Sequence, residues 1–253
     1  KRTLSGRFNA VARGLIYKIA GGSPVLEQDV YLAKTMPELN DAQKSRFIRY
    51  YELLAEHNGR VNLTAITDPE SVCEKHFADS LLASELIPAG ADCVDVGTGA
   101  GFPGIPLMIV RGDIGMTLVD AIAKRVAFLE LVCAELDLNA SCIHARAEDL
   151  GHDSRYRERF NVALTRAVAS APVLAELTVP LLKVGGVSIM YKGAAQDQEL
   201  KECLSAFDKL NVTGEIIQCS VGWGRRCLLT ARKLTPTAPV YPRRPANIKK
   251  RPL

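Results

Sequence analysis

The glycine-rich stretch at residues 95–104 carries the clearest chemical signal in the sequence. It reads Asp-Val-Gly-Thr-Gly-Ala-Gly-Phe-Pro-Gly, with an apolar pair before it and the apolar run 105–110 after it. Glycine lacks the Cβ atom that would block close approach, so four glycines between a strand and a helix predict a turn whose backbone contacts a ligand. The stretch therefore predicts a site for a nucleotide-like cofactor.

The spacing within this stretch narrows the choice of cofactor. The dinucleotide fingerprint G-x-G-x-x-G requires a glycine where Phe102 stands. The chain instead has Asp95 followed by Gly97, Gly99 and Gly101. The Asp95 carboxylate can accept hydrogen bonds from N–H groups of the turn or from a cationic group of a ligand. This pattern favours S-adenosylmethionine over NAD, and a purely structural turn is the alternative.

A second carboxylate supports a cofactor site. Residues 116–120 resemble a strand that ends in Asp120, about twenty residues after the glycines. In nucleotide-binding α/β folds a carboxylate at this point bonds the ribose hydroxyls of an adenosine. Alternatively, Asp120 caps the helix that follows it. This residue alone does not exclude NAD.

The elements that must position these residues alternate between strands and helices after residue 88. This alternation predicts a mostly parallel sheet with helices on both faces, and such sheets bind ligands at the carboxyl ends of their strands. Two final strands are expected to pair antiparallel at the edge, which makes seven strands. The strand candidates are 92–96, 116–120, 141–144, 162–165, 187–192, 215–219 and 227–231; the helix candidates are 103–111, 122–137, 171–182 and 196–210.

Three parts are expected along the chain. Helical periodicity at 42–57 and 69–86 predicts a helical extension, so residues 1–88 form a basic arm with that extension. Residues 89–235 form the cofactor-binding domain. Residues 236–253 form a basic, Pro-rich tail that is expected to be extended rather than packed.

Composition excludes several classes of protein. No run of eighteen apolar residues occurs, so neither a membrane span nor a membrane partner is expected. Seven cysteines without a C-x-x-C pair argue against a disulfide framework and against a zinc site, and no metal is expected. A reducing cytoplasm suits this cysteine usage.

Charge is unevenly distributed along the chain. Residues 1–26 hold five basic residues and residues 216–253 hold nine, and neither segment contains an acid. The part between them has 18 basic against 28 acidic residues. Clustered Lys and Arg bind phosphate backbones by releasing counterions, so nucleic acid is the expected partner. The alternatives are a solvated surface and, for the first segment, a transit peptide.

Nine motifs together resemble one family. The chain is similar, from about residue 41 to its end, to the bacterial 16S ribosomal RNA guanine-N7 methyltransferases, also called the glucose-inhibited division protein B family. The motifs, in order, are Asn-Leu-Thr-Ala-Ile at 62–66, His-Phe-Ala-Asp-Ser-Leu at 76–81, the stretch 95–106, Lys-Arg-Val-Ala-Phe-Leu at 124–129, Arg-Ala-Glu at 146–148, Arg-Ala-Val-Ala at 166–169, Leu-Leu-Lys-Val-Gly-Gly at 181–186, Tyr-Lys-Gly at 191–193 and Tyr-Pro-Arg-Arg at 241–244.

The resemblance implies a Rossmann-like class I methyltransferase fold, with S-adenosylmethionine as the methyl donor for guanine N7. It places the cofactor against Gly97, Phe102, Ala147, Glu148 and Arg166. The substrate, 16S rRNA or the small ribosomal subunit, is expected on the side of six other residues. These are Asn62, His76, Asp79, Lys192, Arg225 and Arg226. Alternatively, His76 is a core histidine satisfied by Asp79, and the three cations are solvated.

The expected chemistry requires no catalytic side chain. Guanine N7 has a free lone pair at neutral pH, so proximity and alignment suffice. The sequence lacks the Pro-Cys pair used for cytosine C5 and the Asn/Asp-Pro-Pro-aromatic motif used for exocyclic amines. We therefore expect a monomeric, cytoplasmic rRNA methyltransferase. An RNA-binding protein with a vestigial cofactor site, an RNA methyltransferase of other base specificity and an NAD-dependent dehydrogenase are the alternatives.

Overall fold

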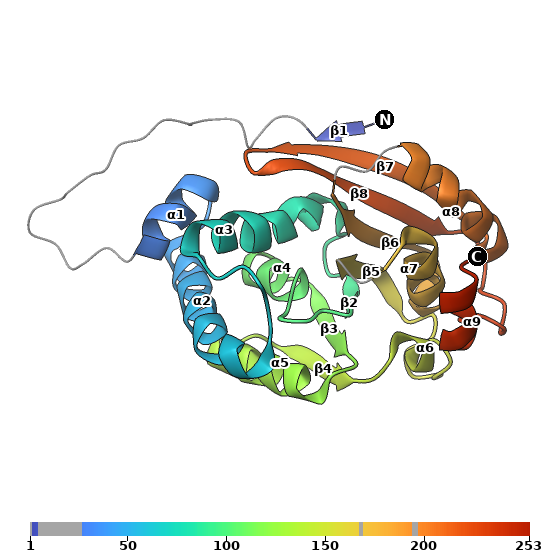
Figure 1. Cartoon of the computed structure of the whole chain (residues 1–253), viewed down its shortest axis with the longest axis horizontal. Helices are drawn as coiled ribbons and strands as arrows, with labels where there is room; N and C mark the ends of the chain where they lie inside the picture. The colour runs from blue at the N-terminus through green and yellow to red at the C-terminus, as the bar shows by residue number, and fades with distance from the viewer. Residues whose placement is uncertain (1, 5–26, 167–168, 194–196) are drawn as a thin grey trace, which may run out of the picture.

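The computed structural model describes residues 2–4, 27–166, 169–193 and 197–253. These residues build one twisted sheet with the strand order β1-β7-β8-β6-β5-β2-β3-β4 (Figure 1). The strands are β1 (Arg2–Leu4), β2 (Asp92–Val96), β3 (Gly115–Asp120), β4 (Ala140–His144), β5 (Phe160–Arg166), β6 (Leu182–Lys192), β7 (Val212–Val221) and β8 (Gly224–Lys233).

The predicted sheet of seven mostly parallel strands is confirmed as β2 to β8. Strands β4, β3, β2, β5 and β6 run parallel, and β8 is antiparallel to both β6 and β7. The first residues of the arm add an eighth strand, because β1 pairs with β7 at the outer edge. The rest of the arm, residues 5–26, lies outside the described residues.

Helices cover both faces of the sheet. Figure 1 shows α1 to α5 on one side of the sheet and α6 to α9 on the other. The α-helices are α1 (Glu27–Thr35), α2 (Asp41–Val61), α3 (Pro69–Val72), α4 (Gly104–Val110), α5 (Ala123–Glu135), α6 (Ala147–Leu150), α7 (Ala171–Thr178), α8 (Asp197–Leu210) and α9 (Pro245–Lys250). The described part of the chain contains no helix that is both long and apolar enough to cross a bilayer.

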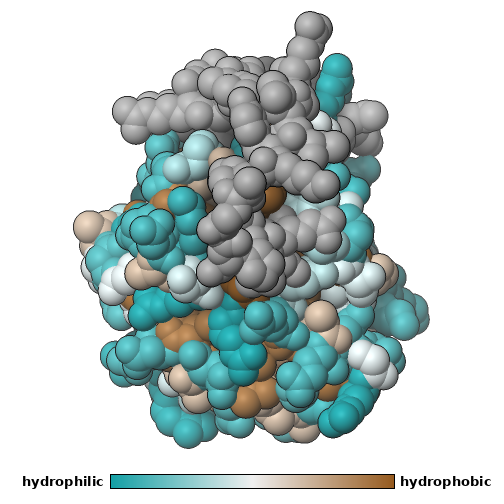
Figure 2. All heavy atoms as spheres, turned by 90° about the vertical axis from the view of Figure 1, so that its left-hand side faces the viewer, coloured by the Kyte–Doolittle hydropathy of each residue, from teal (hydrophilic) through white to brown (hydrophobic). Residues whose placement is uncertain are grey.

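The helical extension shares its core with the sheet. Phe47 of α2 and Phe77 are almost fully buried and belong to the same apolar cluster as Leu118 of β3 and Leu164 of β5. The opposite face of the extension is solvated: Figure 2 shows mostly hydrophilic residues, with small apolar patches, where atoms of the described residues are visible. The extension therefore contributes directly to the core that positions the sheet.

The expected helix at 69–86 is not uniform. It starts as α3, with Asp68 as N-cap and Pro69 in the first turn, and then widens into a π-helix at Cys73–Ala78. It ends as a 3₁₀-helix at Leu81–Leu86. The π-helical turn contains His76 and lies directly before Asp79. Such turns are common at functional sites because they shift side chains out of the regular helical register.

The expectation of an extended tail is wrong. Residues 245–250 form α9, and both Ile248 and Leu253 are buried. Arg243 donates from its guanidinium and from its backbone N–H to Glu176 of α7, whose side chain is fully buried. Arg157 donates to three carbonyls of the tail. Composition suggested an extended segment, but the tail packs because these long-range polar partners fix it.

The pair between Arg243 and Glu176 predicts the stability of an Arg243→Ala variant. Truncating Arg243 leaves a buried carboxylate without its cation, so the free energy of unfolding should fall by about 3 kcal/mol. Arg244→Ala is the matched control, because the Arg244 side chain is exposed. Denaturant unfolding of both variants measures the difference, and equal stabilities would contradict the role of the pair.

Candidate active site

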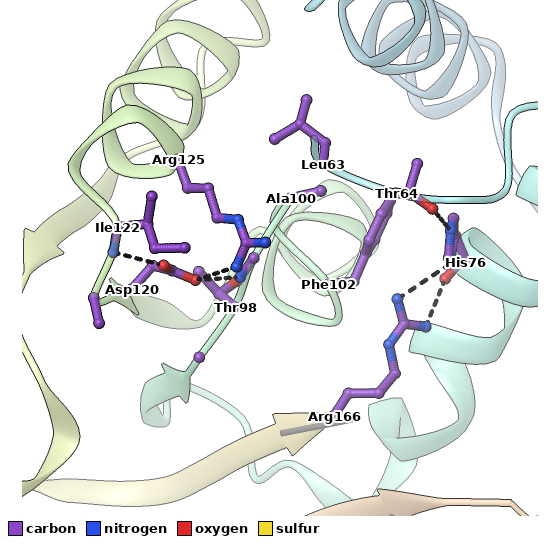
Figure 3. Close-up of a pocket in the computed structure, with 13 residues that line it drawn as sticks. Leu63, Thr64, His76, Thr98, Ala100, Phe102, Asp120, Ile122, Arg125 and Arg166 are labelled. Carbon is purple, nitrogen blue, oxygen red and sulfur yellow. Dashed lines mark hydrogen bonds and ion pairs between the residues drawn. The ribbon is translucent and has the colours of Figure 1, made fainter. Parts of the chain in front are cut away.

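A cavity of about 470 Å³ opens at the carboxyl ends of β2, β3 and β5. Its position matches the place where parallel sheets bind ligands. The volume lies within the usual range for small-molecule sites. The lining residues are Leu63, Thr64, His76, Gly97, Thr98, Gly99, Ala100, Phe102, Asp120, Ala121, Ile122, Arg125 and Arg166 (Figure 3).

The turn after β2 forms one wall of this cavity. Gly97, Gly99 and Gly101 have φ values of 70°, 63° and 107°, which lie in the region that favours glycine. A Cβ atom on Gly101 would overlap Ile105 of α4 and the Tyr50 hydroxyl. That hydroxyl donates to the Ala100 carbonyl at 2.6 Å, so α2 supports the turn from behind. Gly99 differs, since no atom lies within 4 Å of a Cβ placed there.

Asp95 holds the turn together rather than lining the cavity. It is fully buried and accepts hydrogen bonds from Thr98 Oγ1 at 2.6 Å and from the Gly104 N–H at 2.9 Å. Burial raises the pKa of this carboxyl to about 6, and the two hydrogen bonds oppose the shift. The sequence argument left open whether Asp95 binds the turn or a ligand, and these contacts favour the turn.

Asp120, at the end of β3, lies inside the cavity. Its carboxylate accepts from the Gly99 N–H at 3.0 Å and from the Ile122 N–H at 2.9 Å. Arg125 of α5 approaches it at 3.7 Å. The carboxylate therefore ties the glycine turn to Ile122, the N-cap residue of α5, from a position on the cavity wall. The alternative that Asp120 itself caps this helix is wrong, because α5 has no side-chain cap.

The opposite wall is built around Phe102, as Figure 3 shows. The His76 ring stacks on the Phe102 ring with centroids 4.5 Å apart, and the Arg166 guanidinium lies 4.9 Å from the same centroid. His76 Nε2 is 2.7 Å from Thr64 Oγ1, and His76 Nδ1 is 3.4 Å from Arg166 Nη2. Burial lowers the pKa of His76 to about 4, with a further contribution from the Arg166 charge. The ring is therefore neutral near pH 7.

Asp79 lies behind this wall and joins it to the β7–β8 hairpin. Its buried carboxylate accepts from Arg166 at 3.3 Å, from Arg226 Nε at 2.8 Å and from Trp223 Nε1 at 3.3 Å. The suggestion that Asp79 satisfies His76 finds no support, because the partners of the His76 ring are Thr64, Arg166 and the Lys75 backbone. Asp79 instead neutralises two arginines.

Several of the predicted site residues lie outside the cavity. Ala147 and Glu148 at the start of α6 do not line it, and neither do Lys192 and Arg225. Lys192 at the end of β6 donates to the Ala169 carbonyl at 3.1 Å, and Arg225 is exposed in the hairpin. Asn62 is the exposed C-cap of α2, with a φ of 56°.

Sequence reasoning assigned no individual role to seven of the lining residues, which are Leu63, Thr64, Thr98, Ala100, Ala121, Ile122 and Arg125. Thr64 and Leu63 belong to the 62–66 motif, of which only Asn62 was singled out. Ile122 and Arg125 follow Asp120 by two and five residues, which places them in the first turn of α5 or just before it. The signal was present in part, since the motifs at 62–66 and 124–129 contain Leu63, Thr64 and Arg125, whereas Ile122 lies outside the motifs. Within the described residues no three His, Cys, Asp or Glu side chains cluster as metal ligands would.

The chain is similar to many known sequences. The family described as GidB, rRNA small subunit methyltransferase G, matches residues 43–227. A protein of Desulfitobacterium hafniense (strain Y51) named ribosomal RNA small subunit methyltransferase G is 42% identical over 220 residues, which cover 85% of this chain and 92% of the relative. The protein of the same name from Leuconostoc citreum (strain KM20) is 43% identical over 222 residues, covering 85% and 93%.

Solved structures share the fold at low identity. The branched-chain polyamine synthase from Thermus thermophilus has a TM-score of 0.56 at 15% identity, covering 78% of this chain and 64% of that one. The YcgJ protein from Bacillus subtilis has a TM-score of 0.50 at 12% identity, covering 63% and 100%. With the strand order and the family match, these likenesses confirm the Rossmann-like methyltransferase fold. The chain belongs to the family of rRNA small subunit methyltransferase G.

Proposed function

We propose that this protein transfers the methyl group of S-adenosylmethionine to N7 of a guanine in 16S rRNA. The observation that carries the proposal is the cavity where the glycine turn, Asp120 and Arg166 meet at the carboxyl ends of three parallel strands. Membership of an rRNA methyltransferase family supports RNA as the substrate. A monomer in the cytoplasm remains our expectation.

The cavity fits the methyl donor. Gly97 and Gly99 expose backbone to the cavity, and Gly99 leaves space that any side chain would occupy. The Asp120 carboxylate accepts hydrogen bonds and is available for the ribose hydroxyls. Phe102 offers an apolar surface beside them. S-adenosylmethionine supplies an activated methyl group on a sulfonium, and we assign its binding to these four residues and Arg166.

The other predicted cofactor residues act differently in this proposal. Asp95 and Gly101 preserve the shape of the turn, the first through its two hydrogen bonds and the second through its φ of 107°. Contacts from Ala147 and Glu148 remain a prediction of the family resemblance. Both residues follow β4, the neighbour of β3 in the sheet.

The chain's contribution to the reaction is positioning. Guanine N7 attacks through its own lone pair, so no side chain has to remove a proton first. The cavity wall made of His76, a hydroxyl and Arg166 agrees with this chemistry, because the lowered pKa of His76, about 4, makes its ring a weak base. In this proposal the walls position the two reactants for in-line transfer.

The RNA is expected to approach past the β7–β8 hairpin. Arg226 links this hairpin to the cavity wall through Asp79, and Arg225 beside it is exposed. Exposed cations close to an active site attract the phosphate backbone. We therefore assign Arg225, Lys192 and Asn62 to the substrate side, with Arg226 and Asp79 fixing the hairpin. The basic tail packs against α7, so its exposed cations would serve as a separate surface.

Expression in a bacterial strain that lacks its own 16S N7-methyltransferase tests the function. N7-methylguanine should appear in 16S rRNA, because the target base supplies the nucleophile and the protein supplies the site. Borohydride reduction followed by aniline cleavage maps the modified base. Unmodified 16S rRNA at full expression of a folded protein would refute the proposal.

Gly99→Leu should abolish binding of the methyl donor. The new side chain fills the cavity, so we expect affinity in calorimetry to fall by about a hundredfold or more. Gly90→Leu is the matched control, because the two glycines have nearly the same backbone angle. The φ of Gly90 is +66° and that of Gly99 is +63°, and nothing lies within 4 Å of a Cβ atom added at either position. Both variants should lose about 1 kcal/mol of stability from the strained backbone. Equal affinities for the donor would contradict the assignment of the cavity.

The neutral state of His76 predicts a pH dependence of stability. Its pKa is about 4 in the folded protein against 6.5 ordinarily, so the unfolded chain binds more protons between these values. Stability from this group should rise with pH from about 4 to 6.5 and disappear as the pH falls through 4. Asp95 has the opposite effect on stability, because its pKa is about 6 in the folded protein against 3.8 ordinarily. Its contribution to stability therefore falls as the pH rises between these two values.

Comparison of wild type with His76→Gln isolates this contribution, since Asp95 is common to both proteins. The difference in free energy of unfolding should grow with pH up to about 6.5 and then stay constant. Denaturant titrations at several pH values measure it. A difference that does not change between pH 4 and 6.5 would show that His76 is not held neutral.

A further inference from the structure

The hydroxyl of Thr64 lies on the cavity wall with two neighbours at hydrogen-bond distance. The Ile66 N–H donates to Thr64 Oγ1 at 3.0 Å, and His76 Nε2 lies 2.7 Å from the same oxygen. A hydroxyl has two lone pairs and one proton. Ile66 occupies one lone pair. The proton position on His76 therefore decides whether Thr64 presents a proton or a lone pair to the cavity.

Arg166 favours one proton position on His76. Its guanidinium has only donors, and Nη2 lies 3.4 Å from His76 Nδ1. In this contact the neutral ring accepts at Nδ1 and carries its proton on Nε2. The Lys75 backbone also hydrogen-bonds the ring, so the Arg166 contact favours this tautomer without imposing it. That proton points to Thr64 Oγ1 and occupies the second lone pair. A protonated ring would also carry a proton on Nε2 and would donate to Thr64 in the same way. Only the neutral tautomer with its proton on Nδ1 would instead accept the Thr64 proton at Nε2.

With both lone pairs occupied, the Thr64 hydroxyl has only its proton to offer. We propose that Thr64, next to Arg166, is a donor that binds an oxygen acceptor on a ligand in the cavity and thereby positions it for methyl transfer. His76 acts through Thr64 as a positioning residue. The inference rests on the proposed function, which supplies two ligands with such an oxygen: the carboxylate of the methyl donor and O6 of guanine.

A wall that only donates also gives selectivity between purines. Adenine has an N7 lone pair like guanine, but it carries an amino donor at position 6 where guanine has the acceptor O6. Two donors facing each other lose a hydrogen bond and leave buried groups unpaired. If O6 is the acceptor, Thr64 and Arg166 therefore favour guanine. If the carboxylate is the acceptor, they orient the methyl donor instead.

Three variants test the hydroxyl. Thr64→Val keeps the shape of the side chain and removes the donor, and Thr64→Ser keeps the donor. Thr67→Val is the matched control, because Thr67 lies in the same loop and is exposed. Calorimetry measures the affinity for S-adenosylhomocysteine, which has the carboxylate, and for 5′-methylthioadenosine, which lacks it. Transfer of labelled methyl groups to 16S rRNA gives kcat/KM.

We expect Thr64→Val to cause about a tenfold loss either in the affinity for S-adenosylhomocysteine or in kcat/KM, and Thr64→Ser to restore the lost value. Weaker binding of S-adenosylhomocysteine with unchanged binding of methylthioadenosine identifies the carboxylate as the acceptor. Unchanged binding of both with a lower kcat/KM identifies the guanine. Wild-type values for Thr64→Val in all three measurements overturn the proposal, as does an equal loss in Thr67→Val.

The tautomer of His76 is tested without any ligand. Nitrogen-15 chemical shifts in the free protein at pH 7 should show the proton on Nε2, and Arg166→Gln should lower that preference. A proton on Nδ1 in the wild type would overturn the inference even if the protein methylates RNA. Failure of the wild type to bind either nucleoside would instead refute the proposed function, so the two failures are distinguishable.

Discussion

A single buried carboxylate closes the turn on which the cavity depends. Asp95 is inaccessible to solvent, and it links the turn to the first residue of α4 through Thr98 and Gly104. Burial raises the pKa of this carboxyl because a charge is costly away from water, and the two hydrogen bonds oppose the shift. The backbone that faces the cavity keeps its shape because this polar contact is shielded from water and held by tight packing around Gly101.

The second constraint is that the cavity belongs to two parts of the chain. The sheet provides the glycine turn, Asp120 and Arg166, and the extension provides Thr64 and His76. Phe102 joins them, because His76 from the extension and Arg166 from the sheet lie against the same ring. The extension is thus a wall of the site as well as a part of the core.

Local sequence signals predicted most of the sheet and one half of the cavity. The glycine turn and Asp120 could be found because strand, turn and helix follow one another directly in the chain. The other half depends on contacts between distant residues, such as Tyr50 with Ala100 and Arg166 with His76, which periodicity does not encode. The tail was misjudged for the same reason, since its composition suggests an extended segment and its partners Glu176 and Arg157 lie far earlier in the chain.

The position of Asp79 has a consequence for the order of events during synthesis. The chain is made from its N-terminus, so Asp79 emerges from the ribosome 87 residues before Arg166 and 147 residues before Arg226. Until both arginines exist, burial of this carboxylate would leave a charge without partners in an apolar environment. The extension is therefore translated early but can complete its docking only after the last strand of the sheet has formed.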